Sequence, residues 1–151
     1  MALLEVKELV KTYGGRAVLD GDSFDLEEGE AKVVMGPSGC GKSTLLRCLN
    51  LLIEPTSGAI LLDGKDITRR GGDVRAVRSR IGFVFQNFAL YRDMSVLDNV
   101  TLALRRLKKM PKREAEERAL HELDRMEMAE KRDAYPAALS GGQSQRVAIA
   151  R

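Results

Sequence analysis

The 151-residue sequence contains no tryptophan, one histidine, two cysteines and few aromatic residues, which make up 5% of the chain. A metal or redox role for Cys40 or Cys48 therefore has no supporting partners, and we expect both thiols to be reduced. No apolar run approaches the roughly 20 residues that a membrane-spanning helix requires. The formal net charge is only +3, and no basic run alternates with aromatic residues. The composition thus gives no reason to expect a nucleic-acid partner.

What is present is ordinary for one soluble globular domain with a real core: 44% hydrophobic and 31% charged residues. Charges at Glu5, Lys7, Glu8 and Lys11 indicate that the N-terminus is not a signal peptide. The clearest charge cluster, residues 104–133, mixes both signs and is typical of a solvated helical face. His121, inside that cluster, is expected at the surface.

Three glycines within six residues, Gly36 to Gly41, stand directly before a helical stretch. The preceding residues 31–36, "AKVVMG", predict a short buried strand because β-branched valines favour strands. After the loop, apolar residues recur at helical spacing, whereas Arg47 and Asn50 fall outside the apolar face. The residues of the expected face are Leu45, Leu46, Leu49, Leu52 and Ile53.

Within this strand, loop and helix, Gly36, Gly41, Lys42 and Ser43 fit the pattern G-x-x-x-x-G-K-[ST]. Backbone N–H groups of such a loop form a concave anion site, and the helix N-terminus adds further donors. The lysine can reach phosphate oxygens, and the serine hydroxyl can bind Mg²⁺. The alternative is a glycine-rich turn with a solvated lysine. A dinucleotide loop fits poorly, because its third glycine would fall at Thr44.

The remaining chain begins β-rich and becomes helical. We expect strands at residues 3–10, 18–20, 23–30 and 80–86, with a hairpin-like turn at Gly14–Gly15, and a turn–strand–turn unit over residues 54–67. A helix should begin after Ser95, with Ser95 as its N-cap and Asp98 as the acidic third residue. Its apolar side comprises Val96, Leu97, Val100, Leu104 and Leu107. A second helix should run from about Pro111 to Lys131.

Near the end of the sequence, Ser140 and Gln143 have the spacing of a capping box. Two glycines between them, Gly141 and Gly142, are unusual if capping is their only role, since they leave backbone N–H groups accessible to an anion. Taken alone, this segment fits a capped helix and an anion site equally well.

Together these segments resemble the ATP-binding subunit of ABC transporters, over the entire chain. "GPSGCGKST" is similar to the family's Walker A motif, "LSGGQ" at 139–143 to its signature motif, Gln86 to its Q-loop glutamine and Tyr13 to its A-loop aromatic residue. Residues 45–58 and 84–103 look most like importers of polar amino acids. The resemblance implies an α/β P-loop NTPase fold with an N-terminal antiparallel β part and a helical subdomain.

The resemblance also implies roles for individual residues and for partners. Two such subunits would pair head to tail, as a homodimer or with a related subunit, with ATP and Mg²⁺ between them. Residues 87–95 would receive a membrane permease, and a solute-binding protein would act indirectly. The implied location is cytoplasmic, peripheral on the inner face of the plasma membrane. Catalytic residues would be Lys42 and Gln86, magnesium ligands Ser43 and Gln86, and nucleotide-binding residues Tyr13, Gly36, Pro37, Ser38, Gly39, Cys40, Gly41, Lys42, Ser43, Thr44, Ser140, Gly141, Gly142 and Gln143.

The family's Walker B aspartate and catalytic glutamate have no counterpart in this sequence. We therefore expect an N-terminal portion of such a subunit: residues 1–86 as an incomplete ATP-binding core with its β subdomain, and residues 87–151 as the Q-loop and helical subdomain ending in the signature helix. Residues 1–151 alone are expected to hydrolyse ATP poorly. Three functions stay open: an ATPase subunit for amino-acid import, a soluble ABC-type ATPase without a transporter, and a nucleotide-binding fragment without catalysis.

Overall fold

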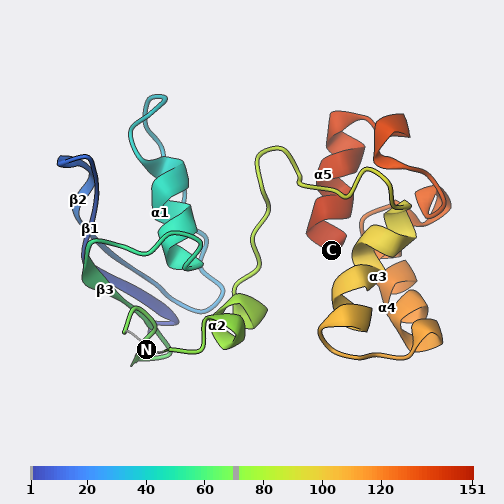
Figure 1. The fold of residues 1–151 in the computed structure, drawn as a ribbon, viewed down its shortest axis with the longest axis horizontal. Helices are drawn as coiled ribbons and strands as arrows, with labels where there is room; N and C mark the ends of the chain where they lie inside the picture. The colour runs from blue at the N-terminus through green and yellow to red at the C-terminus, as the bar shows by residue number, and fades with distance from the viewer. Residues whose placement is uncertain (1, 70–71) are drawn as a thin grey trace. The chain divides into compact units, whose positions relative to one another are not determined.

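The structure, a computed structural model, describes residues 2–69 and 72–151. The chain divides into two compact units, with the division between Phe83 and Val84 (Figure 1). Unit 1, the N-terminal one, combines a β-sheet with helices α1 and α2. Unit 2, the C-terminal one, is helical. Each unit has its own hydrophobic core.

The sheet of unit 1 is antiparallel and has four strands in the order β2-β1-β3-β4. Its strands are β1 (Leu4–Tyr13), β2 (Arg16–Leu26), β3 (Ser57–Leu62) and β4 (Lys65–Asp66). Gly14 and Gly15 connect β1 to β2 with φ angles of 55° and 80°, which confirms the expected turn. Two consecutive positive φ angles are typical of the two-residue hairpin turns that match strand twist.

Strand β2 differs from the sequence prediction. Residues 18–20 and 23–26, expected in two separate strands, form one continuous strand that pairs with β1 throughout its length. Residues 27–30, expected at the end of the second strand, lie outside the sheet. The long partner β1 explains the difference, because each added residue of β2 gains ladder hydrogen bonds.

A bulge interrupts β1 between Lys7 and Val10, where its register with both neighbours shifts. Glu8 has a positive φ of 47° at this point, and its N–H donates to Ser23 Oγ at 2.8 Å. Gly58 of β3 lies against the bulge so closely that a Cβ atom there would overlap the Glu8 carbonyl group. The bulge therefore requires a glycine across from it.

Helix α1 (Lys42–Leu49) follows the glycine loop, as expected, but its buried face differs. Leu45 and Cys48 are buried, whereas Leu46 is 46% exposed, because positions 45, 48 and 49 follow the i, i+3, i+4 spacing and 46 does not. The helix ends at Leu49, so Leu52 and Ile53 lie beyond it. Asn50 is also buried, contrary to expectation, and its Nδ2 donates to the Ile81 carbonyl at 3.4 Å.

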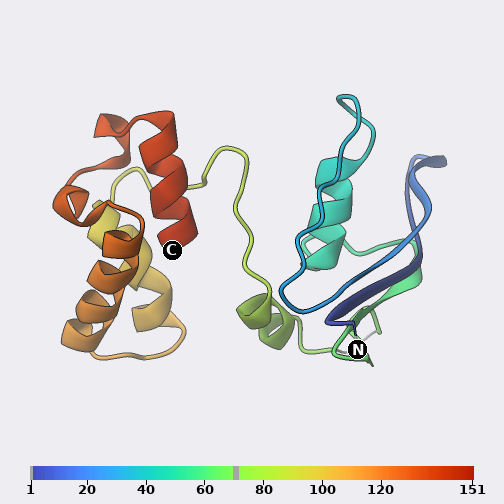
Figure 2. The same ribbon diagram turned by 180° about the vertical axis from the view of Figure 1, so that it is seen from behind.

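Two predicted strands are absent. Residues 31–36 have no strand assignment and are exposed, with Val33 at 80% and Met35 at 84%. Residues 81–86 have no strand assignment either, and Arg80 belongs to α2 (Val74–Arg80). Figure 2 shows the segment between β2 and α1 from behind, without regular structure. A β-prone sequence becomes a strand only when a second strand satisfies its backbone groups, and none of the described strands pairs with either segment.

Unit 2 consists of α3 (Val96–Arg106), α4 (Lys112–Arg125) and α5 (Gly141–Ala150), with short 3₁₀ turns at Ala129–Lys131 and Pro136–Ala138. Ser95 caps α3 as expected: its Oγ accepts from the Asp98 N–H at 3.1 Å. Helix α4 ends at Arg125 rather than near Lys131, because Glu127 adopts a left-handed conformation with φ 55°. His121 is exposed on α4, as expected.

The core of unit 2 is small and comes from all three helices. Val96 and Val100 of α3, Ala119 and Leu123 of α4 and Val147 of α5 are buried together. Leu107, expected on the apolar side of α3, lies just beyond the helix and is exposed. None of the helices in residues 2–69 and 72–151 is long and apolar enough to cross a membrane.

The close approach of Gly58 to the bulge leads to a prediction about the free energy of unfolding. Replacing Gly58 by Ala should lower the free energy of unfolding by about 2–4 kcal/mol, because the methyl group would force β3 away from Glu8 in addition to straining the backbone. Gly64→Ala is the matched control. Gly64 also has a positive φ, 72°, but open space around its Cβ position, so only about 1 kcal/mol should be lost. Urea unfolding measures both values, and equal losses would show that the steric contact is unimportant.

Candidate functional site

The glycine loop is shaped by three left-handed glycines. Gly36, Gly39 and Gly41 have φ angles of 153°, 81° and 100°. A Cβ atom on Gly41 would lie 2.6 Å from the Val18 carbonyl oxygen of β2. Only glycine can combine this φ with this approach to a neighbouring strand. The sheet therefore determines where the loop ends and α1 begins.

Lys42, the first residue of α1, folds its side chain back into this loop. Its Nζ donates to the carbonyl oxygens of Gly36 at 2.7 Å and Pro37 at 2.6 Å, and lies 3.6 Å from Cys40 Sγ. The loop thus encloses an ammonium group, whose charge is balanced by main-chain dipoles and not by a carboxylate. A phosphate group bound here would replace the two carbonyl oxygens as the acceptor of the Lys42 hydrogen bonds.

The rest of the loop is open to solvent. Pro37, Ser38, Cys40 and Ser43 are exposed, and Thr44 is half-buried. No side chain caps the first turn of α1, since Gly41 is its N-cap residue. The N–H groups at the start of this helix are therefore without a side-chain acceptor, the arrangement that suits an anion.

Tyr13 ends β1 at the glycine hairpin and is 48% exposed. Lys11 Nζ lies 5.1 Å from the ring centroid and also donates to the Glu54 carbonyl at 2.8 Å. Unit 1 therefore presents an accessible aromatic ring beside a cation. Base stacking on such a ring is a common mode of nucleobase binding.

Gln86 lies in unit 2, exposed at the start of a turn. The residues that follow it, 87–95, form a loop that is stabilised by Asn99, a fully buried residue of α3. Asn99 Oδ1 accepts from the Tyr91 N–H at 2.8 Å, and its Nδ2 donates to the carbonyls of Tyr91, Met94 and Ser95 at 3.0, 3.1 and 2.9 Å. Sequence reasoning missed Asn99, although an asparagine beside Val100 on the apolar side of a helix is a usable signal.

Arg151, the residue that follows α5, also stabilises this loop. Its Nη1 donates to the Ala89 carbonyl at 2.6 Å and its guanidinium carbon lies 5.8 Å from the Tyr91 ring centroid. Phe88 and Ala89 both have positive φ angles, 60° and 48°, so this bond stabilises a strained turn. A cavity of about 730 Å³ lies beside the loop. It is lined by Phe85, Ala89, Tyr91, Asn99, Leu102, Ala103, Arg106, Leu107 and Arg151.

The capping box at the start of α5 is present. Ser140 Oγ accepts from the Gln143 N–H at 3.3 Å, and Gln143 Oε1 accepts from the Ser140 N–H at 2.9 Å. Gly141 and Gly142 are exposed, neither has a positive φ, and a Cβ atom on either would meet no atom within 4 Å. Nothing within the described parts of the chain requires glycine at these two positions. The cap explains Ser140 and Gln143, but not the glycines between them.

The antiparallel sheet, the glycine loop that wraps a lysine and the helices of unit 2 define a P-loop NTPase fold of the ABC type. A family model described as ABC transporter matches residues 19–151. This chain belongs to the ABC transporter family.

Known proteins support the assignment. The chain is 45% identical over 148 residues to the glutamate/glutamine/aspartate/asparagine transport ATP-binding protein BztD of Rhodobacter capsulatus, covering 98% of this chain and 56% of that protein. It is 46% identical over 149 residues to the arginine transport ATP-binding protein ArtM of Bacillus subtilis, covering 99% and 62%. The chain thus spans about three fifths of the length of these curated relatives.

Solved structures agree. CbiO1 of Clostridium perfringens, described as part of the ABC transporter complex CbiONQ, is 35% identical and superimposes with a TM-score of 0.85, covering 99% of this chain and 60% of that one. The ATP-binding cassette MJ0796, in a dimeric post-hydrolysis state bound to ADP and Pi, is 36% identical with a TM-score of 0.84, covering 97% and 67%.

The two thiols should differ in reactivity. Cys40 is exposed in the glycine loop, whereas Cys48 lies on the buried face of α1, and burial raises the pKa of the Cys48 thiol. Because the thiolate is the reactive form, an alkylating reagent at mildly alkaline pH should modify Cys40 and spare Cys48 until the protein unfolds. Mass spectrometry of a time course, with Cys40→Ser as the control, measures this. Equal labelling of both thiols in the folded protein would contradict the placement of α1.

Proposed function

We propose that this chain belongs to the ATP-binding and ATP-hydrolysing subunit of an ABC importer for polar amino acids, and that residues 1–151 alone hydrolyse ATP poorly. The observation that carries the proposal is the geometry at Gly41 and Lys42. There the sheet forces a left-handed turn that brings an ammonium group into a loop of exposed main chain. The names of BztD and ArtM, both amino-acid transport ATP-binding proteins, support the substrate class.

In this proposal unit 1 holds the nucleotide. Tyr13 stacks on adenine, and the main-chain N–H groups of residues 36–41 bind phosphate oxygens. Lys42 exchanges the Gly36 and Pro37 carbonyls for β- and γ-phosphate oxygens, and the Thr44 hydroxyl adds a donor nearby. Such preorganised donors stabilise the charge that develops during phosphoryl transfer.

Ser43 and Gln86 are the proposed magnesium ligands, since a hydroxyl and an amide oxygen are hard donors that suit this ion. Magnesium, when bound, neutralises part of the phosphate charge. Gln86 would also orient the attacking water. Residues 2–69 and 72–151 contain no cluster of three or more His, Cys, Asp or Glu side chains that could hold a metal ion. The family resemblance implies an aspartate and a glutamate that have no counterpart in this sequence, and we propose that efficient hydrolysis requires them.

The start of α5 is the proposed contact with the nucleotide of a paired subunit. The Ser140 hydroxyl and the N–H groups of Gly141 and Gly142 face solvent at a helix N-terminus, where they can receive a phosphate group. Gln143 contributes by holding Ser140 through the capping box. Glycines without an internal reason are expected where another chain approaches the backbone closely.

Residues 87–95 and the adjoining cavity are the proposed docking site for the membrane permease. Asn99 and Arg151 hold this loop in one shape, and an apolar cavity beside a rigid loop suits an inserted helix. A permease partner places the chain peripherally on the inner face of the plasma membrane, with a solute-binding protein acting through the permease.

Nucleotide binding is tested by Lys42→Ala. Loss of a charge-assisted contact of about 1.5–3 kcal/mol should weaken Mg-ATP binding by roughly tenfold to a hundredfold. Lys65→Ala is the control, because Lys65 is an exposed lysine of the same unit on β4. Calorimetric titration measures both affinities. An unchanged affinity for Lys42→Ala would refute the proposed site.

The role of Ser140 is tested against a second capping serine. Ser140→Ala and Ser95→Ala each remove an N-cap hydroxyl and should lower the free energy of unfolding by about 1 kcal/mol. In the complete protein, only Ser140→Ala should also impair ATP-driven dimerisation and turnover, because only Ser140 would contact the nucleotide of a second subunit. Thermal unfolding and phosphate release separate the two effects. Normal turnover for Ser140→Ala would show that Ser140 acts only as a helix cap.

A further inference from the structure

The connection between α3 and α4 carries a concentration of positive charge that the proposed function does not use. From Leu104 to Arg113 the sequence "LRRLKKMPKR" has six basic residues and no acidic one. We name this segment the basic connection. The surrounding helices are mixed in sign, so the local excess contrasts with a net charge of only +3 for the whole chain.

The backbone gathers these charges at one end of α3. Lys109 has a left-handed conformation with φ 55°, and the Met110 N–H returns to the Leu104 carbonyl at 3.1 Å. The chain therefore folds back over the last turn of α3 instead of extending away from it. The C-terminal dipole of α3 accounts for Arg105 and Arg106 but does not require further lysines beyond the helix.

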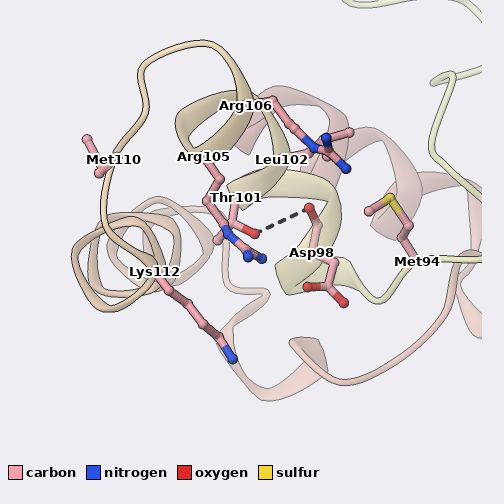
Figure 3. Close-up of a pocket in the computed structure, with 8 residues that line it drawn as sticks. All are labelled: Met94, Asp98, Thr101, Leu102, Arg105, Arg106, Met110 and Lys112. Carbon is pink, nitrogen blue, oxygen red and sulfur yellow. Dashed lines mark hydrogen bonds between the residues drawn. The ribbon is translucent and has the colours of Figure 1, made fainter.

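A cavity of about 400 Å³ opens beside this turn. Figure 3 shows Arg105 and Arg106 extending from α3 in different directions, and Lys112 at the start of α4 also lines the cavity. Its one acidic lining residue, Asp98, is already engaged, because its carboxylate accepts from Ser95 Oγ at 2.9 Å. Three cations and one locally bonded carboxylate leave this cavity positive.

The cations differ in whether they have partners. Lys112 lies 3.6 Å from Glu116, and Arg113 donates to Glu117 at 3.0 Å. By contrast, the side chains of four exposed residues have no hydrogen-bond or ion-pair partner among the described residues. These are Arg105, Arg106, Lys108 and Lys109.

Apolar side chains lie between the free cations. Leu107 is 67% exposed although it continues the apolar side of α3, and Met110 is half-buried at the cavity. Solvation of a charged surface does not explain an exposed leucine among four cations. Alternating cationic and apolar side chains on one short segment is the composition that binds the interface of an anionic bilayer.

We propose that the basic connection is a docking surface for anionic phospholipid headgroups. Arg105, Arg106, Lys108 and Lys109 bind headgroup phosphates, and Leu107 enters the region between headgroups and acyl chains. The proposal rests on the proposed function in one respect: a permease partner brings the chain within reach of a bilayer. Charge complementarity favours a lipid surface over a soluble protein partner, because four unpaired cations flank a single exposed apolar side chain.

The test is co-sedimentation of the full chain with vesicles. Vesicles of equal parts phosphatidylcholine and phosphatidylglycerol should bind the protein, and vesicles of phosphatidylcholine alone should not. Binding should fall as sodium chloride is raised, since salt screens the attraction. Replacing Arg105, Arg106, Lys108 and Lys109 together by glutamine should lower the vesicle partition coefficient by at least about tenfold.

The matched control removes the same charge from the same unit but outside the basic connection by replacing Arg118, Arg125, Lys131 and Arg132 with glutamine, and should keep binding within about threefold. Similar losses in both variants, or no loss in the first, would overturn the proposal. Displacement of the protein from vesicles by inorganic phosphate or polyglutamate, at constant ionic strength, would overturn it in favour of a soluble anion or an acidic peptide.

Mg-ATP titration of the same samples keeps this proposal separate from the proposed function. Both glutamine variants should bind nucleotide as the parent chain does, because none of the exchanged residues belongs to the glycine loop. Vesicle binding without nucleotide binding would count against the nucleotide site alone. Nucleotide binding without vesicle binding would overturn the docking surface alone.

Discussion

The approach of Gly41 to the Val18 carbonyl of β2 is the constraint on which the nucleotide site depends. It sets the end of the loop, the first residue of α1 and therefore the point from which Lys42 can turn back into the loop. A side chain at position 41 would separate loop from sheet by the width of a methyl group. The chemistry proposed for this site thus follows from a packing requirement between a turn and a strand.

In unit 2, polar side chains stabilise the loops and the helix ends. Its hydrophobic core is small and its loops are long. Buried hydrogen bonds and helix caps therefore stabilise the loops and helix ends that apolar packing does not. Asn99 satisfies four main-chain groups of residues 91–95, and Ser95 and Ser140 cap α3 and α5. A buried amide that makes all its bonds specifies one loop shape, because any other shape leaves polar groups unsatisfied.

Local signals predicted the parts of the fold that local interactions stabilise. The Gly14–Gly15 turn, the capping serines and the start of α1 each depend on residues a few positions apart, and each was confirmed. The predictions that were wrong depended on distant partners. Residues 31–36 and 81–86 have strand composition but no neighbouring strand among those described, and Asn50 is buried because of a contact with Ile81.

The sequence by itself determined the motifs: the spacing of Gly36, Gly41 and Lys42 and the Ser140–Gln143 box identify the family, because each motif's function needs its residue types at fixed separations. Only the tertiary structure decided which contacts the residues of these motifs and their neighbours make. It placed Lys42 against loop carbonyls, left open space around the Cβ positions of Gly141 and Gly142 and brought Arg151 to Ala89. Such contacts join residues far apart in the chain, and their energies depend on burial and approach that no local pattern encodes.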